Sequence, residues 1–185
     1  ELLRLLGLQS VYARAIYKAN SEIPHIICTG QVTLDALKNL CDELFNEDHG
    51  IQTKNLVVLQ QGDPNPACEL FLNGNKYKYE IFLSFLNGDP LTKSGLKKCD
   101  VHKAKDGILL TNKNSRDPQS SDHKNILTAL ALKKYVFETR KDKKTLRLCI
   151  QLIKPESKIH YMSSLKIPST DQLIIVEEIK MNLLA

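Results

Sequence analysis

The sequence lacks the marks of a membrane span, a secreted chain and a thiolate metal site. No apolar run approaches the ~20 residues that a span needs, and no signal-peptide pattern is present. The five cysteines form no C-x-x-C pair and no zinc-type spacing with histidine. Several lie inside apolar runs, so we expect buried, reduced thiols in a soluble cytosolic protein.

A glycine-aromatic pattern among the basic residues is also missing. Lysine and arginine number 26 against 21 acids, a net charge of +5, but the lysines are scattered or sit in short runs such as 97–98 and 141–144. We therefore expect a solvated lysine surface and no nucleic-acid partner. At 185 residues and 42% apolar composition, the chain is long enough for one domain with a sizeable core.

Short apolar runs alternate with segments of helical spacing. The strand-like runs lie at 25–28, 55–59, 79–83, 107–110, 146–152 and 172–176. Between them, two segments carry amphipathic stripes, one at Leu34, Leu37, Leu40, Cys41 and Leu44, the other at Ile126, Leu127, Leu130 and Tyr135. Strands without alternation, separated by helices, predict an α/β fold: a doubly wound, mostly parallel Rossmann-like sheet with helices on both faces.

The two ends of the chain fit this scheme less well. Residues 1–23 precede the first strand, belong to no βα unit, and are interpreted as an incoming, partly helical linker. Residues 24–176 form the expected lobe. Residues 177–185 begin a helix whose Ile179, Leu183 and Leu184 need something to pack on. That predicts either a fragment of a longer protein or a surface for a partner.

The stretch "PHIICTGQVTL" (24–34) has the outline of a nucleotide-binding turn between a strand and a helix. The dinucleotide fingerprint G-x-G-x-x-G is incomplete, because Gly30 fills the first place while Val32 and Asp35 occupy the others. The acid expected at the end of the second strand is absent, and Gln60 and Gln61 stand there. We therefore expect no bound NAD. The five histidines are scattered with no nucleophile spaced to them, so no catalytic residues are predicted.

Acidic residues crowd the end of the first predicted helix, in "CDELFNEDHG" (41–50). A helix C-terminus carries partial negative charge, so acids there cost stability unless a cation compensates. Carboxylates and helix-end carbonyls are also ligands of a hard cation such as Ca²⁺. No EF-hand loop is present, so a site would need ligands from elsewhere. Two readings stay open: exposed acids screened by salt, and part of a calcium site.

The stretch "GILLTNKNSRDPQSSDHKNILTALALKKY" (107–135) resembles the fourth strand and following helix of the first RCK (regulator of potassium conductance) domain in the Slo family of calcium-activated potassium channels. The match rests on Leu109, Leu110, Asn112, Lys113, Asp117, Pro118, Asp122, Asn125, Ile126, Lys133 and Tyr135. "HIICTGQVTL", "LKIPS" (165–169) and "VEEIKMNLLA" (176–185) are similar to that family's first strand, fifth-helix exit and crossover helix. "ELLRLLG" is similar to the linker that leaves the pore helix.

This resemblance implies metal positions. Glu43 and Asp48 fall on the family's calcium-sensing acids, with Glu43 standing where the family typically has Asp. Glu80 matches one acid of a low-affinity magnesium site, but Asn55 replaces the other. The remaining calcium ligands belong to a later half of the domain that this chain lacks. We therefore expect a partial calcium site of weak affinity, and a possible magnesium site.

The resemblance also implies a function. RCK lobes pair and form a gating ring on the cytoplasmic side of the pore of a homotetrameric channel, and residues 1–23 would transmit its movement to the pore domain. Helices at 119–137 and 156–166 would carry assembly contacts or ordinary core. The expected function is thus a non-catalytic regulatory lobe. The alternatives are a nucleotide-binding RCK-like or dehydrogenase-like Rossmann domain, and a stand-alone interaction module.

Overall fold

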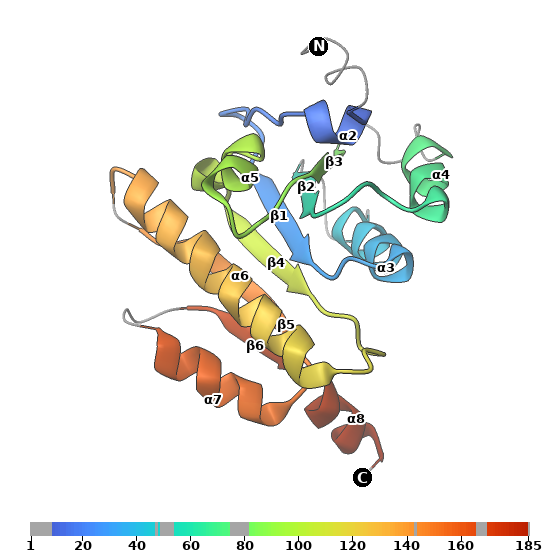
Figure 1. Ribbon diagram of the computed structural model, residues 1–185, viewed down its shortest axis with the longest axis vertical. Helices are drawn as coiled ribbons and strands as arrows, with labels where there is room; N and C mark the ends of the chain where they lie inside the picture. Colours follow the sequence, from blue (N-terminus) through green and yellow to red (C-terminus); the bar gives the residue numbers. More distant parts are fainter. Residues whose placement is uncertain are drawn as a thin grey trace.

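Six parallel strands form a single sheet (Figure 1). The computed structural model describes residues 9–46, 48, 54–74, 82–142, 144–165 and 170–184. The strands are β1 (His25–Gly30), β2 (Asn55–Gln60), β3 (Leu83–Asn87), β4 (Asp106–Leu110), β5 (Arg147–Leu152) and β6 (Gln172–Ile175). Their order is β3-β2-β1-β4-β5-β6, and each neighbouring pair is parallel. The chain therefore reverses direction across the sheet between β1 and β4, which is the doubly wound topology predicted from the sequence.

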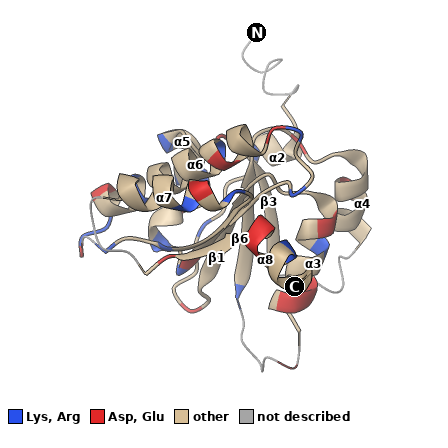
Figure 2. Ribbon diagram, turned by 90° about the horizontal axis from the view of Figure 1, so that it is seen from below, with Lys and Arg blue, Asp and Glu red and all other residues tan. Residues whose placement is uncertain are grey.

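Helices connect these strands and cover the two faces of the sheet. They are α2 (Val11–Arg14), α3 (Leu34–Leu44), α4 (Pro66–Gly74), α5 (Lys93–Lys98), the 3₁₀ helix η2 (Val101–Lys103), α6 (Pro118–Thr139), α7 (Pro155–Ser164) and α8 (Val176–Leu184). Figure 2 shows α5, α6 and α7 together on one side of the sheet. Within the described residues, no helix combines the length and the apolar character needed to cross a bilayer.

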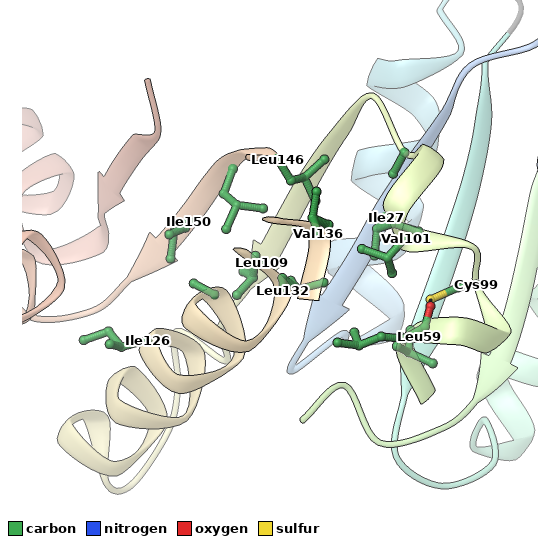
Figure 3. Packing of buried hydrophobic residues seen from close by; sticks show 14 of the residues in the cluster. Ile27, Leu59, Cys99, Val101, Leu109, Ile126, Leu132, Val136, Leu146 and Ile150 are labelled. Carbon is green, nitrogen blue, oxygen red and sulfur yellow. Dashed lines mark hydrogen bonds between the residues drawn. The ribbon is translucent and has the colours of Figure 1, made fainter. Parts of the chain in front are cut away.

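Alternate residues of the central strands point to opposite faces of the sheet, and each face has its own hydrophobic core. On the face of α3 and α4, Ile26 and Cys28 pack with Leu37 and Cys41. On the opposite face Ile27 packs beneath α5, η2 and α6 in a larger cluster (Figure 3). The predicted stripe of α3 is confirmed, since Leu37 and Cys41 are fully buried and its other apolar members pack around them. Burial of both faces explains why the strands lack alternation.

Two strand boundaries differ from the predicted ones. The third strand was expected at 79–83 but lies at Leu83–Asn87, where it pairs with the whole stretch Leu56–Gln60 of β2; residues 79–81 are outside the described residues. The last strand ends at Ile175, because Val176 already begins α8. Short apolar runs indicate that a strand is present more reliably than they fix its ends.

The buried face of the long helix α6 matches the predicted stripe in part. Ile126 is buried as expected, but Leu127 is 56% exposed. The face against the sheet carries Ile126, Ala129, Leu132 and Val136 together with the polar residues Asp122, Asn125 and Lys133. Polar side chains on the inner face blur the hydrophobic stripe. The predicted stripe is therefore confirmed at Ile126, Leu130 and Tyr135, which belong to or pack against the core, and wrong at Leu127.

Asp122 joins the start of α6 to the start of α7. Its carboxylate is fully buried and accepts hydrogen bonds from the backbone N–H groups of Ile153 (2.8 Å) and Lys154 (2.9 Å) and from the Ser157 hydroxyl (2.7 Å). The free N–H groups before α7 are thus satisfied by a side chain from another helix. Hydrogen bonds to a charged group in such a place are worth about 1.5–3 kcal/mol each.

Lys133 anchors the same helix about three turns further on. Its ammonium group lies 2.8 Å from the Asp171 carboxylate, with both side chains buried, and it donates to the Leu146 carbonyl at 3.1 Å. Asp171 also accepts from the Tyr161 hydroxyl (2.6 Å) and the Leu148 N–H (2.8 Å). Burial and this hydrogen bond raise the pKa of Tyr161, so its hydroxyl stays protonated. The buried charges are paired and hydrogen-bonded, as burial of charge demands.

Asp122→Asn is expected to lower the free energy of unfolding by about 2–4 kcal/mol, because the amide keeps one acceptor oxygen and turns its NH₂ donor toward the donors that the other carboxylate oxygen accepted. Urea denaturation followed by circular dichroism measures this. The matched control is Asp117→Asn at the exposed N-cap of α6, where Asp117 accepts from the Ser120 N–H; Asn caps as well as Asp, so that change should be nearly neutral. Equal, small effects of the two variants would contradict the role given to Asp122.

Candidate functional site

A cleft of about 390 Å³ opens at the carboxyl edge of the sheet. It lies between the turn after β1, the ends of β2 and β3, and the first half of α6; its lining includes Gly30, Gln60, Asp89 and Asn125. This is the point where the strand order reverses, which is where open α/β sheets bind their ligands. The geometry of the β1 turn therefore decides whether a nucleotide fits.

Gly30 sits at the tightest point of that turn. Its φ is +99°, and a Cβ atom there would collide with the Leu110 carbonyl oxygen and lie 2.9 Å from the Asn125 Oδ1. Asn125 is itself buried and donates to the carbonyls of Leu110 and Gln151, both at 3.1 Å. Glycine is thus required here by the approach of β4 and α6, with no ligand needed to explain it.

The polar groups next to Gly30 are occupied by the protein. The Gln31 N–H donates to the Leu110 carbonyl at 2.9 Å. The Gln31 side chain accepts from the Asn112 N–H and donates to the Ser121 hydroxyl, each at 3.3 Å. A dinucleotide site needs backbone N–H groups that face the pyrophosphate. In this turn the first N–H after the glycine is that of Gln31, and it already donates its hydrogen bond to Leu110 of β4.

Charge in the cleft does not favour a dinucleotide either. Among its described lining residues, Lys124 alone is cationic, while Asp89 is acidic. Val32 lines the cleft and also packs against the core beneath α3. Asp35 lies in the first turn of α3, where it repels a phosphate. Gln60 and Gln61 line the cleft where a ribose-binding acid is required. The residues present do not fit a dinucleotide.

The acids singled out for calcium lie at the other edge of the sheet. Helix α3 leads from the end of β1 back toward the start of β2, so its C-terminal end is at the amino edge. Glu43 stands in its last turn and Asp48 just beyond it, both exposed. The Asp48 N–H donates to the Asn46 side chain at 3.1 Å.

Two carboxylates supply only part of a calcium shell, which takes six to eight oxygens. Nowhere in the described part of the chain do three or more histidine, cysteine or acidic side chains converge as a preformed metal cluster. Glu80, the residue matched to a magnesium site, lies outside the described residues. Asn55, its expected counterpart, donates its amide to the Tyr17 hydroxyl at 2.8 Å. Glu43, Asp48 and Glu80 therefore remain predictions.

The segment before β1 is attached to the lobe from the carboxyl side, where the Ser10 hydroxyl donates to Asp63 after β2, to the amino edge, where Tyr17 meets Asn55 and His25. The sequence did not indicate this attachment. The Tyr17 N–H donates to the Lys98 carbonyl (2.8 Å), the Lys98 ammonium group donates to the Ala13 carbonyl (2.6 Å), and the Ala19 N–H donates to the Asp100 carboxylate (3.1 Å). The Tyr17 ring lies 4.9 Å from that of buried His25. Residues 9–23 thus follow the surface of the domain.

The cysteines confirm one prediction. Cys28, Cys41, Cys68 and Cys99 are buried free thiols, and Cys149 is half-buried. Burial raises the pKa of Cys41 and of Cys99 to about 12, so both stay protonated at neutral pH. These thiols are core side chains and are not prepared as nucleophiles.

A family model described as the calcium-activated potassium channel slowpoke-like RCK domain matches residues 21–173. Among curated relatives, the calcium-activated potassium channel slowpoke of Drosophila melanogaster is 24% identical over 190 residues. That match covers the whole of this chain and 15% of the relative. The chain thus spans a small part of the channel that it resembles.

Solved structures share the fold. The human SLO3 gating ring matches with a TM-score of 0.65 at 19% identity, over 87% of this chain and 25% of that chain. The GsuK channel bound to NAD matches with a TM-score of 0.60 at 14% identity, over 99% and 27%. The TrkA-N domain of the inner membrane protein YbaL from Escherichia coli matches with a TM-score of 0.57 at 13% identity, over 89% and 97%. The predicted Rossmann-like fold is confirmed.

Gly30→Ala is expected to destabilise the domain by about 3 kcal/mol or more, because left-handed strain of about 1–2 kcal/mol adds to a backbone collision. Gly62→Ala is the matched control: its φ is +92°, but no atom lies within 4 Å of the added Cβ, so only the strain remains. Urea denaturation of both variants measures the difference. If the two cost the same, the close packing described around Gly30 is wrong.

Proposed function

Because the chain belongs to the slowpoke-like RCK domain family of calcium-activated potassium channels, we propose that it is a non-catalytic regulatory lobe on the cytoplasmic face of such a channel. It couples divalent-ion binding to pore opening through residues 1–23. The observation that carries this proposal is the family match over 21–173, which includes β1 to β5 and the first half of β6. The cleft at the carboxyl edge also supports the proposal, because the residues that line it do not fit a dinucleotide coenzyme.

The arrangement at the amino edge supports a path for coupling. Glu43 and Asp48 lie at the end of α3, from which the chain leads to Asn55 at the start of β2. Asn55 holds Tyr17 of the leading segment by its 2.8 Å hydrogen bond, and its N–H donates to the Pro24 carbonyl at 3.0 Å. A cation that pulls the end of α3 thus acts close to Asn55 at the start of β2, and Asn55 bonds the segment that leads toward the pore.

Energetically, calcium opens a channel only if it binds the open arrangement more tightly than the closed one. A coupling of about 1–3 kcal/mol per site is typical, and four subunits multiply its effect. Glu43 and Asp48 contribute carboxylate oxygens, and the rest of the shell comes from outside the described residues. In an isolated chain we therefore expect weak calcium binding. Magnesium is the weaker case, because Asn55 offers a neutral amide oxygen where the family has a charged carboxylate.

Assembly with other RCK lobes into the ring of a homotetrameric channel completes the proposal. Helices α6 and α7 lie next to each other on one face of the sheet (Figure 1). They expose large apolar side chains: Leu127 is 56% exposed, Ile159 70% and Met162 55%. Apolar groups gathered on neighbouring helices suit an interface with a second lobe.

In the full-length channel, Asp48→Asn is expected to shift calcium-evoked opening to at least several-fold higher calcium, because one charged ligand is lost. Patch recording of open probability against calcium concentration measures this. Asp42→Asn is the control, since it removes the same charge from the same helix end without touching the assigned ligand. An unchanged calcium response in Asp48→Asn, or an equal shift in Asp42→Asn, would count against the assignment.

The isolated chain is expected to show no concentration-dependent rise in Tm with NADH or ATP. A ligand at a hundred times its Kd would stabilise the fold by about 2.7 kcal/mol, which thermal melting detects easily. The GsuK channel, solved with NAD bound, provides a positive control under the same conditions. A clear stabilisation of this chain by NADH would favour the nucleotide-binding alternative.

A further inference from the structure

Two neighbouring helices present matched pairs of metal-binding side chains to each other. Gln119 and His123 lie four residues apart near the start of α6, and Glu156 and His160 lie four apart on α7. Residues at this spacing share one face of a helix. All four line a single surface pocket of about 240 Å³ between the helices, away from the cleft at the carboxyl edge and from the acids after α3.

The two imidazoles meet across this pocket. Their ring centres are 6.3 Å apart, with an interplanar angle of 67°. A zinc ion held at ~2.1 Å from one nitrogen of each ring sets the ring centres about 5–6 Å apart. Both rings are exposed, so a small rotation of either side chain reaches that geometry. Glu156 is exposed in the same pocket, one helical turn before His160.

We propose that His123, His160 and Glu156 form a surface site for a divalent transition-metal ion, with Zn²⁺ as the natural occupant, and that the ion ties α6 to α7. Two imidazoles and one carboxylate are a recurrent zinc donor set, and water fills the fourth position. Imidazole favours Zn²⁺, Ni²⁺ and Cu²⁺ over the hard cations Ca²⁺ and Mg²⁺. The three side chains do not converge on one point in this structure, so the proposal requires the exposed Glu156 side chain to rotate toward the two histidines when the ion binds.

The surroundings permit a cation here. Lys154 also lines the pocket, but its ammonium group is held 2.8 Å from the Glu177 carboxylate on α8. Asp122 adds negative charge behind the pocket, where it caps the start of α7. That same carboxylate fixes α7 against α6, so the two histidines are carried by helices already positioned relative to each other. A site on two rigid helices loses little entropy when the ion binds.

Isothermal titration calorimetry of the tag-free chain with ZnCl₂ tests the proposal. One ion per chain is expected, and His123→Gln and His160→Gln should each weaken binding by about tenfold or more, since even outer-shell changes cost that much. Glu156→Gln should weaken it by a smaller factor. The control is His102→Gln, because His102 lies 3.3 Å from Asp100 and is the rival histidine–carboxylate pair. NiCl₂ should compete with zinc, and excess CaCl₂ should not.

The variants at His123, Glu156 and His160 sit at exposed positions and His102 is half-buried, so circular dichroism checks that all four variants fold. Absence of zinc binding in the wild-type chain overturns the site, as does unchanged affinity in both His123→Gln and His160→Gln. Loss of binding in His102→Gln alone would place the ion at Asp100 instead. Unchanged binding in Glu156→Gln would remove the carboxylate from the ligand set. None of these outcomes bears on the calcium proposal, which concerns oxygen ligands at Glu43 and Asp48.

Discussion

The attachment of α6 to the sheet by buried polar side chains is the constraint on which the rest of the domain depends. The face that an apolar stripe would ordinarily occupy carries Asp122, Asn125 and Lys133. Each of these side chains bonds a different part of the half of the fold that contains β4, β5 and β6. A purely apolar face would allow the helix to slide or rotate. Directional hydrogen bonds fix its register, because each misplaced step would leave a buried charge or carbonyl without its partner.

That fixed register explains the state of the carboxyl-edge cleft. Asn125 donates hydrogen bonds to the carbonyls of Leu110 and Gln151 at the ends of β4 and β5. This position brings its side-chain oxygen close to the turn at Gly30. In a nucleotide-binding domain the space above this glycine is left for phosphate. Here the Gln31 N–H and side chain are bonded to β4 and to α6. The glycine is therefore required by packing within the protein, and its presence in the sequence carries no information about a ligand.

This distinction also marks what could be predicted from the sequence. Short apolar runs and helical spacing are patterns among residues close together in the chain. The sheet, its doubly wound order and the buried stripe of α3 follow from these patterns, so they were predicted correctly. The inner face of α6 was predicted wrongly at Leu127, since polar anchors such as Lys133 hide the stripe. The attachment of Tyr17 to Lys98 joins residues far apart in the chain, and no local pattern encodes it. The acids at Glu43 and Asp48 were noticed because they oppose the helix dipole, but their use depends on oxygens contributed from elsewhere.

The separation of the two edges has a mechanical consequence. The cleft lies at the carboxyl edge, while α3 ends at the amino edge, where Asn55 bonds Tyr17 of the leading segment. The same segment also reaches the carboxyl side through the Ser10–Asp63 hydrogen bond. Most of the cleft wall belongs to the body of the sheet and to α6, which are closely packed and deform little. A cation at the end of α3 acts beside Asn55 and Tyr17, on contacts that are few, polar and near the surface. Such contacts exchange between arrangements at small cost, so the amino edge is the better place from which to move a linker.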